Sequence, residues 1–270
     1  MKAWSAPAAS MQSWPRCSSP APEGAMSKED GADDRKTERA AAATYDRIAD
    51  AYAERVDTKP HNAFYDRPAV MSLWHDVKGR DVLDAGCGPG VYAEELVKRG
   101  ARVIAGDISQ RMRELAASRL GNTARVVELD LATRLPFEDA AFDVVNAPLC
   151  LDYIRDWDHA FAEFNRVLKR GGYVVVSCTH PSFDADYFHT ERYFEIEAVE
   201  GPWSGFGERF IMNSYRRPLA EFINAPLRAG LVLDRLLEPL PTQEFQEADP
   251  RRHAELMHRP AFLMMRLRKP

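Results

Sequence analysis

A short apolar segment followed by a glycine-rich loop is the part of this sequence with the clearest chemical use. Residues 82–85 read Val-Leu-Asp-Ala, and Gly86, Gly88 and Gly90 follow at alternate positions. Glycine lets the backbone turn sharply and lets a ligand lie directly against it. A helix expected at 91–99 would aim its first N–H groups into the same space. The segment therefore predicts a binding site for a small molecule with a carboxylate or phosphate end.

The spacing of the glycines leaves two kinds of ligand open. Nicotinamide and flavin dinucleotides use Gly-x-Gly-x-x-Gly, whereas this loop reads Gly-x-Gly-x-Gly with Asp84 two residues before it. A tight strand-to-helix turn with no ligand is the plain alternative, but such a turn needs one glycine and not three. The rest of the chain must decide between these interpretations.

Polar residues also stand at the ends of three further apolar segments. Asp107 ends the segment 102–107, Asp130 follows 124–129, and Asn146 lies near the end of 141–147. Asp107 lies 21 residues beyond Gly86, the spacing of an acid that binds ribose hydroxyls. NAD sites share this feature, so it does not distinguish a dinucleotide site from another nucleoside site. Asp130 is positioned to accept from an adenine amino group, with the N–H of Leu131 facing a ring nitrogen.

These segments alternate with helical patterns, and that alternation predicts how the polar ends come together. We expect helices at 91–99, 110–120, 156–169 and 219–229, with Ser109 as an N-cap and Gly121 as a stop. Strands are expected at 82–85, 102–107, 124–129, 141–147, 173–178, 231–237 and 262–267. Strands that alternate with helices form a parallel sheet with right-handed crossovers. Ligands bind at the carboxyl ends of such strands.

Composition narrows the classes of protein. The chain has 270 residues, 45% hydrophobic content and a formal net charge of −5, so no basic field draws it to nucleic acid. The four cysteines are scattered without a Cys-x-x-Cys pair, and we see no metal site or disulfide framework. No apolar run reaches the ~18 residues that a membrane span needs. We expect a cytoplasmic protein.

The N-terminal residues differ from the rest. Residues 1–25 are rich in Ala, Ser and Pro, and residues 27–36 are charged, so we expect a disordered extension over 1–36 and one domain over 37–270. Met26 is the start that we favour for the natural chain. A helix is expected at 37–56, with Tyr45 and Tyr52 on its apolar face.

Four motifs in order resemble a known family. The acid and glycine loop resembles motif I of class I S-adenosylmethionine-dependent methyltransferases, and the helix containing Tyr45 resembles the helix that covers the cofactor in small-molecule members. Residues 135–145, Leu-Pro-Phe-Glu-Asp-Ala-Ala-Phe-Asp-Val-Val, and residues 167–172, Val-Leu-Lys-Arg-Gly-Gly, are similar to two runs of the type 11 methyltransferase family. Arg170 replaces the family's usual proline. The resemblance covers about residues 40–180.

This resemblance implies a fold and a cofactor. The fold is α/β and Rossmann-like, with a seven-stranded, mostly parallel sheet in the order 3-2-1-4-5-7-6, an antiparallel last strand and helices on both faces. The cofactor is S-adenosylmethionine. The cofactor contacts that we predict, from the residues and the resemblance together, are Tyr45, Tyr52, Asp84, Ala85, Gly86, Gly88, Gly90, Asp107, Ile108, Asp130, Leu131 and Asn146.

The segment 181–215 is rich in aromatic residues and lies outside the strand–helix repeat. We interpret it as a lid insertion over the acceptor, and the alternative is an accessory β-element that shields the sheet edge. His180 is the candidate general base because it follows a strand end and titrates near neutrality; the alternative is a histidine that hydrogen-bonds to the lid backbone. Tyr153 is a second candidate, to orient the acceptor.

The function that we expect is methyl transfer to a small-molecule acceptor, with the attacking atom left open among O, N and C. A non-catalytic, regulatory protein that binds S-adenosylmethionine is the main alternative. A nicotinamide-dependent oxidoreductase is disfavoured by the glycine spacing. A nucleic-acid methyltransferase is disfavoured because strand four ends in Asn146-Ala147-Pro148-Leu149 and not in a base-flipping motif such as Asn-Pro-Pro-Tyr. The sequence does not determine an oligomeric state.

Overall fold

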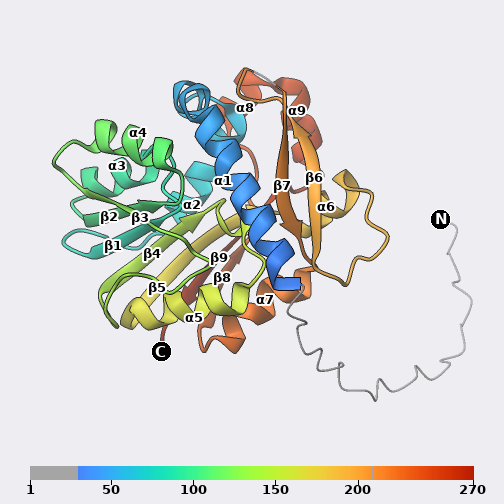
Figure 1. The fold of residues 1–270 in the computed structure, drawn as a ribbon. Coiled ribbons are helices and arrows are strands. Elements are labelled where there is room, and N and C mark those ends of the chain that lie inside the picture. The colour runs from blue at the N-terminus through green and yellow to red at the C-terminus, as the bar shows by residue number, and fades with distance from the viewer. Residues whose placement is uncertain (1–29, 208) are drawn as a thin grey trace, which may run out of the picture.

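The strands of the alternating region form one sheet (Figure 1). The computed structural model describes residues 30–207 and 209–270, so the expectation for residues 1–25 lies outside the described residues. The strands of this sheet are β1 (Asp81–Ala85), β2 (Arg102–Asp107), β3 (Arg125–Glu128), β4 (Phe142–Pro148), β5 (Leu168–Thr179), β8 (Val232–Leu237) and β9 (Phe262–Arg268).

The order of the strands confirms the predicted fold. The sheet runs β3-β2-β1-β4-β5-β9-β8, which is 3-2-1-4-5-7-6 when only its own strands are numbered. The first five strands are parallel. β9 is antiparallel to both β5 and β8. The carboxyl ends of β1, β2, β4 and β5 therefore meet at one edge of the sheet, as the argument from the polar strand ends requires.

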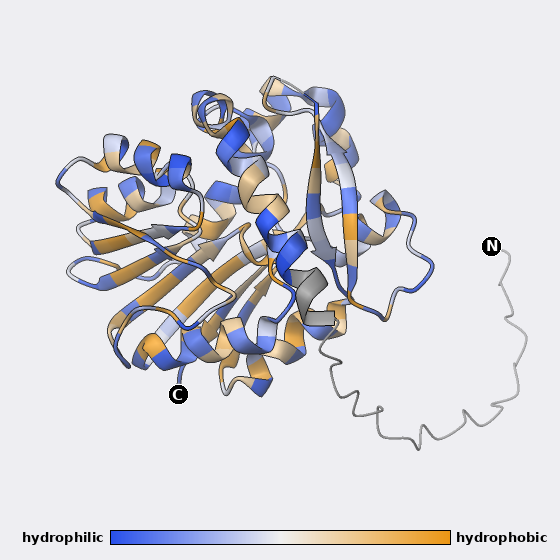
Figure 2. Ribbon diagram, viewed as in Figure 1, coloured by the Kyte–Doolittle hydropathy of each residue, from blue (hydrophilic) through white to orange (hydrophobic). Residues whose placement is uncertain are grey.

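Helices cover both faces because successive strand residues point to opposite sides. Val145 and Val174 pack against α5 (Trp157–Val167) and α7 (Leu219–Arg228). Val144 and Val175 belong to the opposite core. That core also holds residues of η1 (Asn62–Asp66), α2 (Arg67–Ser72), α3 (Val91–Lys98), α4 (Gln110–Leu120), α8 (Gln243–Ala248) and α9 (Pro250–Leu256). Figure 2 shows hydrophobic residues along the central strands and mostly hydrophilic residues on the outer helix surfaces.

Two helix boundaries differ from the sequence expectation. The helix α1 (Asp30–Arg55) begins before residue 37, so the chain over 30–36 is helical and not disordered. The helix expected at 156–169 ends at Val167, because Leu168 pairs with Phe142 and already belongs to β5. The β4–β5 pairing is interrupted before Tyr173, and Gly171 takes a positive φ of 75° there.

The insertion after β5 is a short helix and a β-hairpin. It comprises α6 (Pro181–Tyr187), β6 (Glu197–Trp203) and β7 (Phe210–Arg216), and the two strands form a separate antiparallel sheet. Phe206 and Met212 of this insertion pack on Ile48 of α1 in a third apolar cluster. In Figure 1 the blue α1 lies between the main sheet and the orange hairpin. The insertion is thus anchored to the N-terminal helix.

The described residues contain no helix that is long and apolar enough to cross a membrane.

Candidate functional site

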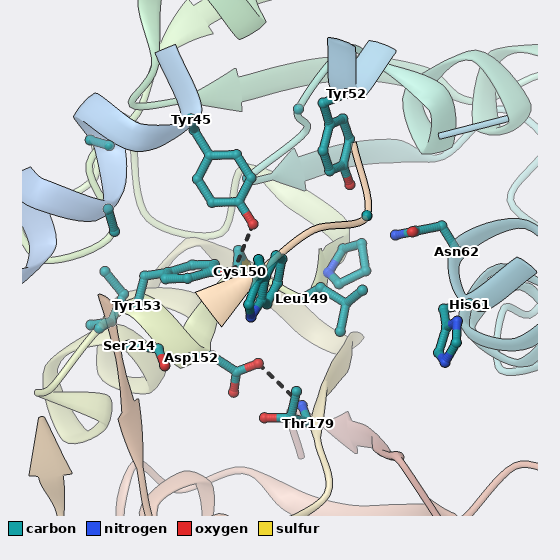
Figure 3. Close-up of a pocket in the computed structure, with 18 of the residues that line it drawn as sticks. Tyr45, Tyr52, His61, Asn62, Leu149, Cys150, Asp152, Tyr153, Thr179 and Ser214 are labelled. Atoms are coloured by element: carbon teal, nitrogen blue, oxygen red, sulfur yellow. Dashed lines mark hydrogen bonds between the residues drawn. The ribbon is translucent and has the colours of Figure 1, made fainter. Parts of the chain in front are cut away.

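A cavity of about 500 Å³ lies at the carboxyl edge of the sheet, between α1 and the insertion (Figure 3). It brings together most of the residues that the sequence singled out. Those that line it are Tyr45, Tyr52, Gly86, Gly88, Asp107, Ile108, Asp130, Leu131 and Tyr153.

The three loop glycines have different roles. All three have positive φ, at 71°, 52° and 83° for Gly86, Gly88 and Gly90. A Cβ at Gly86 would lie 2.4 Å from the Cβ of Cys150, and one at Gly90 would lie 3.2 Å from the Cβ of Ala116. A Cβ at Gly88 would meet nothing within 4 Å. Gly86 and Gly90 therefore allow close packing, whereas Gly88 presents bare backbone to open space in the cavity.

Asp107 fixes the loop and faces the same cavity. Its Oδ2 accepts from the N–H of Gly88 at 2.8 Å, and its Oδ1 accepts from the N–H of Ser109 at 2.9 Å. Burial raises the pKa of this carboxyl, and the two backbone donors oppose that shift. A carboxylate accepts about four hydrogen bonds, so each oxygen keeps capacity for a ligand hydroxyl.

An apolar slot lies beside Asp107. Ile108 is 42% exposed although it lines the cavity, and Leu131 faces it from beyond β3. Asp130 is held by its own turn, because its Oδ1 accepts from the N–H of Ala132 at 2.9 Å. The slot offers apolar surface to a flat ring and one carboxylate to a ring substituent.

Tyrosine residues join α1 to the turn after β4. The hydroxyl groups of Tyr45 and Tyr153 lie 2.7 Å apart. Tyr52 packs beside Tyr45 with ring centroids 6.0 Å apart, and its ring lies 4.5 Å from that of Phe206. Figure 3 shows Tyr45, Tyr52 and Tyr153 around one space. The tyrosines predicted near the ligand thus form one wall of the cavity.

Comparison with known proteins agrees with this geometry. The family model described as a methyltransferase domain matches residues 83–176. The chain is 25% identical to the crystal structure of an S-adenosylmethionine-dependent methyltransferase from Mesorhizobium loti, covering 79% of this chain and 99% of that one with a TM-score of 0.63. Residues 83–176 thus match the methyltransferase-domain family, and the chain shares the fold of an S-adenosylmethionine-dependent methyltransferase.

Curated relatives match over shorter segments of the chain. A demethylmenaquinone methyltransferase of Thermobifida fusca is 39% identical over 147 residues, 52% of this chain and 61% of that protein. A malonyl-[acyl-carrier protein] O-methyltransferase of Erwinia billingiae is 35% identical over 112 residues, 42% of each chain. The chain therefore spans less than two thirds of the length of these relatives.

The matched structure is that of an S-adenosylmethionine-dependent methyltransferase, and the cavity of this chain fits that cofactor. The open space in front of Gly88 is a place that any side chain would fill. Asp107 keeps acceptor capacity beside it. A nucleoside with two ribose hydroxyls and a flat base matches this combination of bare backbone, carboxylate and apolar slot.

Four predicted contacts do not line the cavity, namely Asp84, Ala85, Gly90 and Asn146. Asn146 is buried, donates through Nδ2 to Asp84 Oδ1 at 2.7 Å, and accepts from Trp74 Nε1 at 3.0 Å. Burial raises the pKa of Asp84 to about 7. The amide of Asn146 holds Asp84 under the loop in this arrangement, and its contact with the cofactor stays a prediction.

His180 does not line the cavity either. Its Nδ1 accepts from the N–H of Ser182 at 3.1 Å, and its Nε2 lies 2.9 Å from Glu238 Oε1. Since Nδ1 accepts, the proton of the neutral ring sits on Nε2 and is donated to Glu238. Both nitrogens have partners in this arrangement, so the geometry does not favour His180 as general base, and that role stays a prediction. The alternative interpretation, a histidine bonded to the lid backbone, describes it: His180 is the N-cap of α6.

Sequence reasoning missed two carboxyl groups of the cavity. Asp152 and Asp184 line it and are both buried, and Thr179 lies between them. Thr179 donates its N–H to Asp152 Oδ2 at 3.1 Å and its hydroxyl to Asp184 Oδ2 at 2.8 Å. The sequence did contain a signal for Asp152 and Thr179, because both lie at or after the ends of strands, as Asp107 and Asp130 do. Nothing in the sequence indicated that Asp184 folds back onto them.

Three basic residues, Lys59, His61 and Arg252, belong to another part of the lining. Lys59 and His61 follow α1, and burial lowers the pKa of Lys59 to about 8 and that of His61 to about 4. The Lys59 Nζ lies 3.7 Å from the centre of the Phe206 ring. Figure 3 places His61 and Asn62 across the cavity from Tyr153.

Proposed function

We propose that this protein transfers the methyl group of S-adenosylmethionine to a small-molecule acceptor. The observation that carries the proposal is that one cavity joins the glycine loop and Asp107 to an enclosure of aromatic side chains. The aromatic residues of this enclosure are Tyr153, Phe183, Tyr187, Phe188, Trp203 and Phe206. A cofactor site alone would not need them.

We assign the cofactor half of the cavity as follows. Gly86 and Gly88 offer backbone to the methionine part, Asp107 accepts from the ribose hydroxyls, and Ile108, Asp130 and Leu131 receive the adenine. Tyr45 and Tyr52 close this half from α1. When bound, S-adenosylmethionine supplies a methyl group on a positively charged sulfur. These assignments rest on the lining of the cavity and on the free acceptor capacity of Asp107.

The work of the protein in this reaction is positioning and exclusion of water. Methyl transfer is an in-line displacement, and holding the two reactants in line supplies a large part of the rate enhancement. The insertion covers the cavity with Phe183 and Tyr187 on α6, with Phe188 directly after it, and with Trp203 and Phe206 beside the hairpin turn. Apolar walls keep water from the reacting atoms.

The size of the cavity supports a small acceptor. Its volume of about 500 Å³ must hold both reactants, and pockets for single small molecules are typically about 300–1,000 Å³. The relatives named above act, by their names, on demethylmenaquinone and on a malonyl-[acyl-carrier protein]. These two acceptors differ in chemistry, so the names do not select one for this chain.

Two experiments test the proposal. Calorimetric titration with S-adenosylmethionine and, separately, with NADH should show binding of the first only. Incubation with a metabolite extract and radiolabelled S-adenosylmethionine should then transfer label to a small molecule. Binding without any transfer would favour the alternative of a non-catalytic regulatory protein, and binding of NADH alone would contradict the proposal.

A further inference from the structure

The carboxyl groups of Asp152 and Asp184 have no role in holding the cofactor as assigned above. We propose that Asp152 is the group that accepts the proton of the methyl acceptor, with Thr179 and Asp184 positioning it. The acceptor is then a neutral or cationic molecule whose attacking atom carries a proton, a hydroxyl or an amine, and not a carboxylate or phosphate. This inference rests on the proposed function and names the acceptor class for the same cavity.

Three separate elements hold the two carboxyl groups at one place. Asp152 comes from η2 (Leu151–Tyr153) after β4, Thr179 ends β5, and Asp184 lies in the first turn of α6. Thr179 bonds to both, at 3.1 Å through its N–H and at 2.8 Å through its hydroxyl. Figure 3 shows the Asp152 carboxyl on the cavity side of Thr179, with Tyr153 nearby. A threonine that bridges two buried acids fixes their orientation at the strand end.

The surroundings suit proton uptake near neutral pH. Burial raises the pKa of Asp152 to about 6 and that of Asp184 to about 7. Arg217 favours the charged form of both acids, and Arg216 favours that of Asp184. The charge of Asp152 in turn disfavours the charged form of Asp184. The other titratable groups that interact with Asp152 are Asp66, Cys150, Tyr153 and Cys178. A base is most effective when its pKa lies near the working pH. The pair of carboxyl groups therefore takes up a proton at a higher pH than an ordinary carboxyl group does.

Two cations line the cavity, Lys59 and Arg252, and both act on His61, which lies across the cavity from Tyr153. Neither is among the main charges that act on Asp152 or Asp184. Arg217 is buried outside the lining, stacks 3.9 Å over the Trp157 ring and donates to the carbonyl of Ile154 at 2.8 Å. Lys59 is held over Phe206 instead. An acceptor with a carboxylate beside Asp152 would meet like charge in a site of low dielectric, which costs more than in water.

The aromatic wall is compatible with a ring or an ammonium group. Phe183 and Tyr187 of α6 stack with an interplanar angle of 8°, and the Tyr187 and Phe188 rings meet edge to face. The Lys59 ammonium already lies over Phe206 in the same cavity. A primary ammonium is thus accommodated on one ring of this enclosure, as cation–π attraction predicts.

The proposed step balances without a further reactant. The attacking oxygen or nitrogen gives its proton to the Asp152 carboxylate and forms a bond to the methyl carbon. The carbon–sulfur bond breaks, and its electron pair stays on sulfur. The products are the methylated acceptor, S-adenosylhomocysteine and a protonated Asp152, which returns its proton to solvent. An alkylammonium acceptor first loses one proton to Asp152 and then attacks as the neutral amine.

Three probes of one size test the acceptor class on protein saturated with S-adenosylhomocysteine: phenol, benzylamine and benzoate. We expect phenol or benzylamine to bind at least about tenfold more tightly than benzoate at neutral pH. A hydrogen bond to a charged group contributes enough binding free energy for such a ratio. Preference for phenol would indicate a hydroxyl acceptor and preference for benzylamine an amine. Benzoate binding as tightly as both would overturn the inference.

Variants separate the carboxyl pair from other effects. Asp152→Asn should abolish the preference over benzoate, and Asp184→Asn should reduce it, while both keep their affinity for S-adenosylhomocysteine. Asp186→Asn is the matched control, since Asp186 lies on the same helix α6 and is exposed. If wild-type benzylamine binding does not weaken as the pH falls through about 6 to 7, the pair is not its partner. Failure of the wild type to bind S-adenosylhomocysteine would instead refute the proposed function itself.

Discussion

The hydroxyl groups of Tyr45 and Tyr153 lie 2.7 Å apart and join α1 to the turn after β4 across the cavity. Their rings meet edge to face with centroids 5.3 Å apart. Both residues line the cavity, and burial raises the pKa of each hydroxyl, so both remain neutral donors and acceptors. The N-terminal helix is thereby fastened over the site by a hydrogen bond and not only by apolar packing.

Tyr45→Phe should therefore loosen this cover. A neutral hydrogen bond contributes about 0.5–1.5 kcal/mol, so we expect dissociation of S-adenosylhomocysteine to become up to about tenfold faster. Stopped-flow measurement of the dissociation rate tests this for Tyr45→Phe, Tyr153→Phe and the double variant. The double variant should resemble each single one, because the same bond is lost. Fully additive effects would show that the two hydroxyl groups act separately.

Asp107→Ala should weaken cofactor binding by about 10- to 150-fold, since hydrogen bonds to a charged group are worth roughly 1.5–3 kcal/mol. Calorimetry measures this directly. Glu128→Ala is the control, because Glu128 pairs in register with Asp107 on the neighbouring strand and bonds to Arg113 at the surface. An Asp107→Ala protein that folds and binds with the wild-type dissociation constant would remove Asp107 from the ribose site.

His180→Ala should leave the saturated rate of methyl transfer near the wild-type value, because both ring nitrogens are used in structural bonds. Loss of the α6 cap should instead cost about 1 kcal/mol of local stability. Hydrogen exchange of residues 181–187 should accelerate while that of β5 stays slow. A drop of about 10²-fold or more in the saturated rate at unchanged acceptor affinity would restore His180 as a base.

The stability of the protein should fall as the pH rises from about 4 to 7. Asp84 has a folded-state pKa raised to about 7 by burial, above the unfolded value of about 3.9. The native state thus binds more protons in this window, so its stability is highest below the unfolded pKa and is lost as the pH rises through the folded one. Urea unfolding across this range measures the slope, and Asp84→Asn should reduce it.

Asp81, on the same strand as Asp84, should change the stability with pH in the opposite direction, and Asp81→Asn tests this. Hydrogen bonds from Arg102 and Lys169 lower the pKa of Asp81 to about 2, so its contribution is present above about pH 4 and is lost as the pH falls toward 2. Its removal should leave the slope between about pH 4 and 7 unchanged. If the free energy of unfolding changes with pH equally in Asp84→Asn and Asp81→Asn, the burial of Asp84 does not cause the pH dependence.

The alternation of strands with helices and the polar ends of those strands were predicted from local patterns, whereas the order of the strands came from the resemblance to the methyltransferase family. The strand ends at Asp107 and Asp130 and the loop around Gly88 are short segments. Their residue types alone predicted ligand contacts, without knowledge of the rest of the fold. Parallel topology then brings such ends to one edge. Asn146 was predicted by the same logic, but its side chain turns into the core to meet Trp74, which comes from a distant part of the chain.

The acceptor half depended on contacts that sequence spacing does not encode. His180 follows a strand end as expected, but Glu238 and Ser182 occupy its ring. Asp184 reaches the cavity only because α6 folds back over β5, where Thr179 binds it. An insertion outside the strand–helix repeat has no periodic pattern that fixes its placement. The sequence therefore predicted that the insertion covers the site, but not which of its side chains line the cavity.

The most direct test of the account is a titration of S-adenosylhomocysteine into Gly88→Val and Gly121→Val. Both glycines have nearly the same φ, 52° and 53°, and neither Cβ would meet another atom within 4 Å. Only Gly88 lines the cavity. Both variants should therefore lose similar stability from the strained φ. Gly121→Val should bind like the wild type, and Gly88→Val should show no binding. Equal binding by both variants would contradict the claim that the glycine loop holds the cofactor.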